Sequence, residues 1–145
     1  MLSFIPGIQA TSAALTAERT RLEVISQNIA NANTTRGLDG KPYQRQQVVF
    51  ESALRQAQLG AGGNGETLAA GPVVSRIQGD PRAGRLIYQP GHPDADADGM
   101  VRLPNINLHE EMADYLMASR TFEANLAVMK NARTITMQAL NIGKH

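Results

Sequence analysis

The sequence predicts a mainly α-helical fold with a small β domain: long N- and C-terminal helices that pair as a coiled coil, and a central antiparallel β-rich segment. Two observations lead to this fold class. Apolar residues recur at helical spacing over both ends of the 145-residue chain, and short β-prone runs bounded by glycine and proline lie between them. We expect an N-terminal helix within 1–33, a β-rich middle domain over 34–104 and a C-terminal helix within 105–145.

The N-terminal helix is predicted from about Ile8 to Asn33. Apolar side chains recur there at heptad spacing, and charged side chains fill positions between them. A stripe sustained over about three heptads indicates a helix that packs lengthwise on other helices. The stripe consists of Ile8, Leu15, Leu22 and Ile29, and Ile25 broadens it.

Three asparagines, Asn28, Asn31 and Asn33, crowd into the end of this helix. Asparagine is a poor helix former because its amide competes for backbone hydrogen bonds. Asn33 is well placed to end the helix, since asparagine tolerates the left-handed conformation. For Asn28 and Asn31 we expect amides that bond the backbone of an adjacent chain or segment. Such bonds would fix the register of the apolar seam, as a single buried asparagine does in a coiled coil.

A second, longer helix is predicted from about Asn107 to Asn141. Asn107 and Glu110 fit a capping box in which asparagine replaces the usual serine or threonine. Beyond them a heptad seam follows, with members at alternating steps of four and three. Its members are Leu108, Met112, Tyr115, Ser119, Phe122, Leu126, Met129, Arg133, Thr136 and Leu140. Because the middle domain is too small to cover both helices, each needs the other or a neighbouring copy as a packing partner.

The middle domain, 34–104, consists of short runs separated by glycine and proline. A turn at Asp39-Gly40 precedes a β-prone run through Phe50 in LDGKPYQRQQVVFES, and the runs GPVVSRIQ, GRLIYQP and GMVRLP follow. Such runs with turn residues between them predict a small antiparallel β unit. The stretch GAGGNG at 60–65 is predicted to be a flexible loop.

Composition excludes several classes of function. The chain has 14 basic and 13 acidic residues, a net charge of +1, and no basic run that would track a phosphate backbone. It has no cysteine, so disulfides and thiolate chemistry are excluded. No apolar stretch approaches the ~20 residues that a membrane span needs. The first residues lack a basic n-region, so we expect no cleaved leader.

Three strings imitate active sites without their defining residues. DADADG, at 94–99, opens like a calcium loop, but Asn105 occupies the place of the bidentate glutamate. GAGGNG neither follows a buried strand nor opens a long helix, as a dinucleotide fingerprint must. HEEMA, at 109–113, has Ala113 in the place of the second zinc-binding histidine. We therefore expect no catalytic residue, no cofactor and no metal.

The two ends of the chain resemble the terminal signatures of bacterial flagellar rod and hook axial proteins. ISQNIANANTTRGLDGKPYQRQQVVF resembles their N-terminal signature, a small-residue helix that closes on an Asn-x-x-Asn string. PNINLHEEMADYLMASRTFEANLAVMKNARTITMQAL resembles their C-terminal helix. Within this family, GLDGKPYQRQQVVF and YQPGHPDADADGMVRLPN are most similar to the proximal rod type. The resemblance is weak over 52–85, and Phe122 and His109 stand where tyrosine and an apolar residue are usual.

The resemblance implies a structural, non-enzymatic subunit of the flagellar basal-body rod, which crosses the periplasm and transmits torque. It implies export through the flagellar type III channel without a cleaved signal, and terminal helices that pair as an inner coiled-coil layer. The implied partners are copies of this chain, other proximal and distal rod proteins and the rod-to-ring adaptor, with no nucleic acid and no membrane insertion. The expected assembly interface consists of Ile8, Leu15, Leu22, Ile25, Asn28, Ile29, Asn31, Asn33, Leu108, Met112, Tyr115, Phe122, Asn125, Leu126 and Met129.

Three alternatives stay open at the level of sequence. One is another axial protein of the rod or hook, and a second is a coiled-coil adaptor of a related secretion system. The third is a soluble calcium-binding or enzymatic domain built around the Asp94–Asp98 turn. Calcium titration separates the third from the others. Circular dichroism of the monomer separates the adaptor, which should already be helical and oligomeric.

Overall fold

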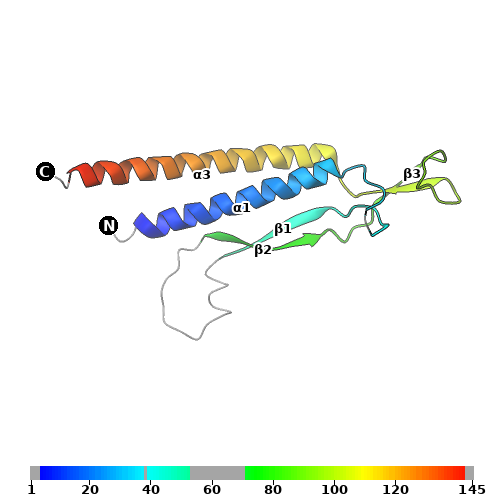
Figure 1. The fold of residues 1–145 in the computed structure, drawn as a ribbon, viewed down its shortest axis with the longest axis horizontal. Helices are drawn as coiled ribbons and strands as arrows, with labels where there is room; N and C mark the ends of the chain where they lie inside the picture. Colours follow the sequence, from blue (N-terminus) through cyan, green and yellow to red (C-terminus); the bar gives the residue numbers. More distant parts are fainter. Residues whose placement is uncertain (1–3, 38, 53–70, 143–145) are drawn as a thin grey trace, which may run out of the picture.

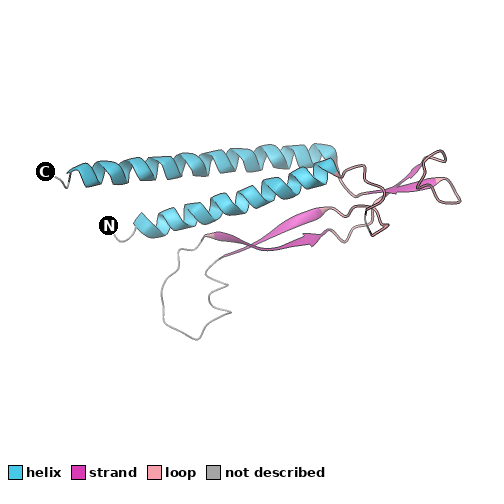
Figure 2. Ribbon diagram, viewed as in Figure 1, coloured by secondary structure: helices cyan, strands magenta, loops and turns pink. Residues whose placement is uncertain are grey.

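A computed structural model describes residues 4–37, 39–52 and 71–142. Two long helices open and close the chain: α1 (Phe4–Ala30) and α3 (Leu108–Ile142). Between them lie the strands β1 (Gln46–Ser52), β2 (Pro72–Gly79), β3 (Arg85–Tyr88) and β4 (Met100–Leu103). Figure 2 shows these as a helix pair flanked by two strand pairs. The predicted fold class, mainly α-helical with a small antiparallel β part, is confirmed. The predicted loop at 60–65 lies outside the described residues.

The helices lie side by side and run in opposite directions, so that both ends of the chain are at the same end of the pair (Figure 1). At ~1.5 Å per residue, α1 is about 40 Å long and α3 about 52 Å long. The β1–β2 sheet packs on α1 and not on α3, so α1 is the middle layer of three. Because of this position α1 buries parts of two faces, whereas α3 has one covered face.

The four β-prone runs all form strands, but in two separate antiparallel pairs. β1 pairs with β2, from Gln46 opposite Gly79 to Ser52 opposite Pro72, with an irregularity between Val49 and Phe50. β3 pairs with β4, with Leu86 opposite Arg102. The predicted turn at Asp39-Gly40 is also present, and Gly40 has a φ of 74°, a backbone conformation that favours glycine.

The β3–β4 hairpin projects beyond the end of the helix pair that is opposite the two termini (Figure 1). Its turn, 89–99, is closed by backbone hydrogen bonds: the Gln89 N–H donates to the Gly99 carbonyl at 2.8 Å, and the Asp96 N–H donates to the Met100 carbonyl at 2.9 Å. Gly99 has a φ of 73°. The hairpin therefore carries an ordered turn beyond the end of the helix pair.

The apolar core is small and divided between two places. Ala17, Val24 and Ile25 of α1 and Ala118 of α3 are buried within the helix pair. Val101 and Leu103 are buried at the base of the hairpin. Small side chains on both helices allow their backbones to approach closely. A core of this size leaves many large apolar side chains of α3 in solvent.

The helix ends differ slightly from the prediction. α3 begins as expected, since the Asn107 carboxamide oxygen accepts the His109 N–H at 3.2 Å and caps the helix. α1, however, ends at Ala30 and not at Asn33. The last ladder bond joins the Asn31 N–H to the Gln27 carbonyl at 3.0 Å, and beyond it the Ala32 N–H donates to the Ile29 carbonyl and the Thr34 N–H to the Asn31 carbonyl, as in turns. The Asn31 side chain supports this turn, because its Nδ2 donates to the Gln27 carbonyl at 2.8 Å and its Oδ1 accepts the Thr34 hydroxyl at 3.1 Å.

The face of α3 that meets α1 is rotated from the predicted seam. The side chains of α3 that are at least half-buried are Glu111, Asp114, Ala118, Ser119, Phe122, Asn125, Met129 and Ala132. Of the predicted seam, only Ser119, Phe122 and Met129 belong to this set. The prediction placed the largest apolar side chains inward, but α1 offers a face rich in alanine. A hydrogen bond between Asn28 and Glu111 sets the rotation of α3 instead.

The hairpin depends on a glycine at its entrance. A Cβ on Gly84 would collide with the carbonyl oxygen of Leu103 in β4. Gly84→Ala is therefore expected to push β3 off β4 and to lower the free energy of unfolding by about 1–3 kcal/mol. Gly91→Ala, in the same hairpin, is the control, because a Cβ there meets nothing within 4 Å. Equal urea midpoints for the two variants would show that the hairpin tolerates the collision.

Candidate assembly site and the polar junction behind it

A buried asparagine joins α1 to the segment that leads into β1. Asn28 is 1% exposed. Its Nδ2 donates to the Gln46 carbonyl at 2.8 Å, and its Oδ1 accepts the Gln46 N–H at 2.9 Å. The Asn28 side-chain amide thus pairs with the Gln46 backbone N–H and carbonyl in the same way as the backbone of a neighbouring β-strand would. They fix the position of α1 along β1, because a slip of one residue would leave buried polar groups unpaired.

The same asparagine also reaches α3. Asn28 Nδ2 donates to Glu111 Oε2 at 3.1 Å, and the other Glu111 oxygen accepts Arg45 Nε at 2.6 Å. Glu111 is 1% exposed and the Arg45 side chain 16% exposed, so this is a buried, charge-assisted contact. One carboxylate thus ties α3 both to α1 and to the residue that precedes β1. We call Asn28, Arg45, Gln46 and Glu111 the polar junction.

A second buried carboxylate extends the polar junction toward β2. Asp80 is 3% exposed, and its backbone N–H donates to the Arg45 carbonyl at 2.7 Å. Its carboxylate accepts Arg82 Nη2 at 2.6 Å and Gln47 Nε2 at 3.1 Å. The hydrogen bonds from the Arg82 side chain and backbone, reinforced by the charges of Arg82 and Arg45, lower the pKa of the Asp80 carboxyl to about 2.

Tyr43 closes the polar junction on one side. Its hydroxyl donates to Asn28 Oδ1 at 3.1 Å. Burial, and then the negative charge of Glu111, raise the pKa of the Tyr43 hydroxyl. The hydroxyl therefore stays neutral at physiological pH and remains a donor, which the doubly accepting Asn28 oxygen requires.

Sequence reasoning found only part of this cluster. The expectation that Asn28 bonds the backbone of an adjacent segment is confirmed, and the segment belongs to the same chain. Asn31 instead bonds within its own helix end. Arg45, Asp80 and Glu111 were missed, because their partners lie far apart in sequence. One signal was available: Glu111 shares its helix face with Ala118, Phe122 and Met129, which is unusual for a solvated carboxylate.

The other predicted interface residues occupy three kinds of environment. Ile25 is buried, whereas Asn33 is exposed. The half-buried residues are Ile8, Leu15, Leu22, Ile29, Asn31, Phe122, Asn125 and Met129. The exposed residues of α3 are Leu108, Met112, Tyr115 and Leu126. Within the chain, then, Phe122, Asn125 and Met129 belong to the covered side of α3, whereas Leu108, Met112, Tyr115 and Leu126 remain exposed.

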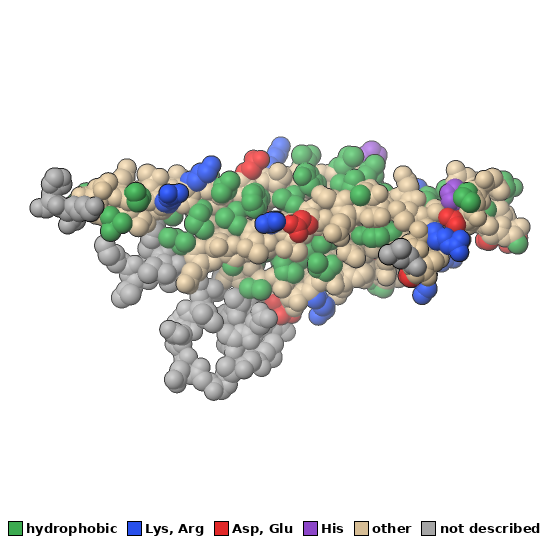
Figure 3. Space-filling model, viewed as in Figure 1, with side chains coloured by type: hydrophobic (Ala, Val, Ile, Leu, Met, Phe, Trp, Pro, Cys, Tyr) green, Lys and Arg blue, Asp and Glu red, His purple; other side chains and the backbone are tan. Residues whose placement is uncertain are grey.

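The exposed apolar side chains of α3 form two flanks. Flank A consists of Leu108, Met112, Tyr115, Leu116, Leu126 and Met137, and flank B consists of Met117, Val128, Ile135 and Ile142. Leu140, also exposed, lies at the same angle around the helix as Phe122. At ~100° per residue, the two flanks are about 160° apart around the helix, and the α1-facing side chains lie between them. Exposure reaches 63% at Met117 and 78% at Ile142. Figure 3 shows apolar side chains spread along the helix pair.

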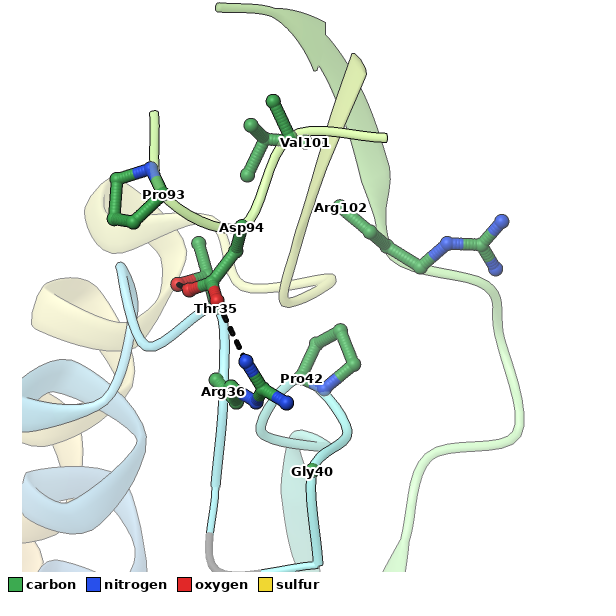
Figure 4. A pocket seen from close by; sticks show the side chains of 9 residues that line it. Thr35, Arg36, Gly40, Pro42, Pro93, Asp94, Val101 and Arg102 are labelled. Carbon is green, nitrogen blue, oxygen red and sulfur yellow. Dashed lines mark hydrogen bonds and ion pairs between the residues drawn. The ribbon is translucent and has the colours of Figure 1, made fainter. Parts of the chain in front are cut away.

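The Asp94–Asp98 turn has its carboxylates engaged locally. Asp94 Oδ2 accepts the Thr35 hydroxyl at 2.7 Å, and Asp94 Oδ1 lies 3.4 Å from Arg36 Nη1 (Figure 4). Asp96 Oδ1 accepts the backbone N–H groups of Asp98 and Met100 at 3.0 and 2.8 Å. These bonds shape the hairpin turn and attach it to the segment after α1.

Two further properties of the described residues bear on function. No group of three or more His, Cys, Asp or Glu side chains among them is arranged to hold a metal ion. Neither α1 nor α3, over the residues that the structure describes, is long and apolar enough to cross a membrane.

Comparison with known families matches both ends of the chain. The family model described as flagella basal body rod protein matches residues 8–36. The model described as flagellar basal body rod FlgEFG protein C-terminal matches residues 97–142. The two matches cover most of α1 and all of α3, which are the elements that the polar junction joins. They point to the axial proteins of the bacterial flagellum.

Full-length relatives carry the comparison further. The chain is 37% identical to flagellar basal-body rod protein FlgC of Yersinia enterocolitica, covering 99% of this chain and 100% of the relative. It is 38% identical to FlgC of Borreliella burgdorferi and 36% identical to FlgC of Bacillus subtilis, covering 98% and 97% of those proteins. The chain therefore belongs to the flagellar basal-body rod protein family. The predicted family, its FlgC-like type and the prediction of a structural protein rather than an enzyme are confirmed.

Loss of the junction carboxylate should destabilise the fold. Glu111→Leu leaves the Arg45 guanidinium buried without its 2.6 Å partner, since the carboxylates of Asp80 and Asp114 lie 3.9 and 4.0 Å away. We expect the free energy of unfolding to fall by about 3–5 kcal/mol. Glu110→Leu, one position earlier and exposed, is the matched control and should change it by less than about 1 kcal/mol. Similar urea midpoints for both variants would contradict the role of Glu111.

Asp80 should give the fold an acid-sensitive component. Its folded pKa of about 2 is below the usual 3.8, so its contribution is present above about pH 4 and is lost as the pH falls through about 2. Asp80→Asn should be less stable than the unmodified chain at neutral pH, and this difference should narrow between about pH 4 and pH 2. Urea midpoints across this range measure it, with Asp98→Asn as control. A difference that is constant with pH would refute the assignment.

Proposed function

We propose that this chain is a structural subunit of the flagellar basal-body rod that assembles through its terminal helices. The observation that supports this most is the surface of α3, which carries apolar side chains on three sides while α1 covers one. Contiguous exposed apolar side chains mark surfaces that bind another protein, so flanks A and B call for neighbours. Covering the exposed half of each such side chain is worth roughly 1 kcal/mol.

Two opposite flanks suit a subunit that has a different neighbour on each side. A contact that joins flank A of one copy to flank B of the next is heterologous, and it generates a ring or an open helix depending on the rotation between copies. In this proposal the α1–α3 pair is a coiled coil in the inner layer, and residues 34–104 form the outer domain. The half-buried stripe of α1, with Ile8, Leu15, Leu22 and Ile29, supplements flank A and flank B at the edges of the pair.

The family resemblance supports the finer parts of the proposal. The partners are copies of this chain, other proximal and distal rod proteins and the rod-to-ring adaptor. The chain leaves the cytoplasm through the flagellar type III export channel, and the assembled rod transmits torque across the periplasm. The polar junction suits this mechanical role, because it holds three elements in one fixed arrangement through buried, directional bonds.

A charge on either flank should abolish assembly without unfolding the chain. Met112→Asp on flank A and Val128→Asp on flank B each place a carboxylate on an exposed site, so circular dichroism and the urea midpoint of the monomer should stay nearly unchanged. In a contact between copies the same carboxylate would be desolvated and unpaired. We expect the subunit to be missing from isolated basal bodies and the cells to be non-motile.

Arg120→Asp is the matched control for both variants. It places a carboxylate on the same helix, at an exposed position on the side opposite the residues that face α1 and outside both flanks. This variant should still be incorporated. Normal incorporation and swimming of both Met112→Asp and Val128→Asp would disprove assembly through α3.

A further inference from the structure

The projecting turn of the β3–β4 hairpin is acidic. Asp94, Asp96 and Asp98 lie within it, and the stretch 89–99 contains no lysine or arginine. Asp96 and Asp98 are exposed, and neither forms an ion pair within the described part of the chain. The bond between Asp94 and Thr35 anchors the turn, and Asp96 Oδ1 accepts the backbone N–H groups of Asp98 and Met100. The Asp98 carboxylate forms no hydrogen bond within the described residues.

At the base of the same hairpin lies a cleft of the opposite charge. This cleft has a volume of about 410 Å³, and its lining includes Lys41, Arg82 and Arg102 but no acidic residue. All three side chains are exposed, and Lys41 and Arg102 form no ion pair within the residues that the structure describes. Exposed carboxylates thus lie in the hairpin turn, while the unpaired cations of the cleft lie on β4 (Arg102) and on the segment after α1 (Lys41).

A hydrogen-bond donor on this cleft also lacks a partner. Asn105 lines the cleft, and its Nδ2 is shielded from solvent with no hydrogen-bond acceptor among the described residues. A shielded polar atom without a partner costs free energy. The surface of the cleft offers two free cations, Lys41 and Arg102, to an acidic group.

We propose that the acidic turn of one copy docks into the basic cleft of the next copy, with Asp96 and Asp98 facing Lys41 and Arg102. The tip projects and the cleft is recessed, so the contact is heterologous and repeats in one direction. Exposed charge pairs of this kind contribute orientation and specificity more than affinity. The contact would thus set the rotation between outer domains, while the flanks of α3 supply most of the binding. This inference rests on the proposed function, because it requires copies to lie side by side in the rod.

Cross-linking between two marked versions of the chain tests the contact. One version carries Asp98→Cys, and the other carries Arg102→Cys together with a size tag near residue 60. Because the chain has no cysteine of its own, a thiol cross-linker reports only the introduced pair. A short bismaleimide is preferable to a disulfide, since an Asp–Arg pair holds its Cα atoms further apart than a disulfide allows.

The control pair is Asp98→Cys with Arg76→Cys, because Arg76 is an exposed residue of β2 outside the cleft. In isolated basal bodies we expect the Asp98→Cys and Arg102→Cys pair to give at least about five-fold more cross-linked mixed dimer than the control pair. Incorporation of both versions without this enrichment would overturn the inference and leave the proposed function standing. Absence of the unmodified chain from basal bodies would overturn both. A cross-link from residue 102 to a different rod protein would overturn the choice of a second copy as occupant.

Charge reversal gives a second measurement with its own rescue. Asp98→Arg and Arg102→Glu each replace an attraction by a repulsion and should lower incorporation several-fold in competition with the unmodified chain. The variant that carries both changes restores opposite charges and should return to within about two-fold of the unmodified chain. If the double variant is incorporated no better than the weaker single variant, the pairing is wrong.

Discussion

The structure depends on one buried carboxylate. Glu111 accepts hydrogen bonds from Asn28 of α1 and from Arg45 at the entrance to β1, so a single side chain fixes three elements that are distant in sequence. Burying an ion pair contributes little net stability, because desolvation offsets the attraction. Its value lies in geometry: a rotation of α3 or a slip of α1 would leave a buried charge unpaired. Apolar contacts alone could not impose that precision, because they are not directional.

This constraint explains why the apolar residues of α3 are distributed as they are. With Glu111 fixed toward α1, Leu108, Met112 and Tyr115 are turned to one side and Met117 and Val128 to the other. The buried polar cluster therefore determines which apolar side chains are left for neighbours. The hydrogen bond between Asn28 and Glu111 therefore both holds the single chain together and determines which apolar side chains of α3 are exposed to neighbouring subunits.

Much of the fold could be predicted from local pattern. Heptad spacing gave both helices, and Gly/Pro punctuation gave all four strands, because these signals lie within each segment. The rotation of α3 could not be predicted in this way. Size and hydrophobicity placed Met112 and Tyr115 inward, whereas the true inward position belongs to Glu111, whose partner Arg45 is 66 residues away. A charged residue at a core position is identified only through its partner, and single-sequence periodicity carries no information about that. The end of α1 was misplaced by three residues for a local reason, because the Asn31 side chain and carbonyl bond Thr34 and support a turn there.

The antiparallel arrangement also has a consequence for motion. Directional bonds clamp α1 and α3 near Asn28 and Glu111, far from the end of the pair where α1 begins and α3 finishes (Figure 1). Along α3, the exposure of the side chains rises with distance from that bond. From Arg133 onward every described residue of α3 is exposed. Local opening should therefore begin at the termini and travel inward, with backbone amides exchanging fastest there and slowest beside the clamp. In the isolated subunit the two helices would therefore stay fixed relative to each other near Asn28 and Glu111 and would fluctuate most at the opposite end of the pair.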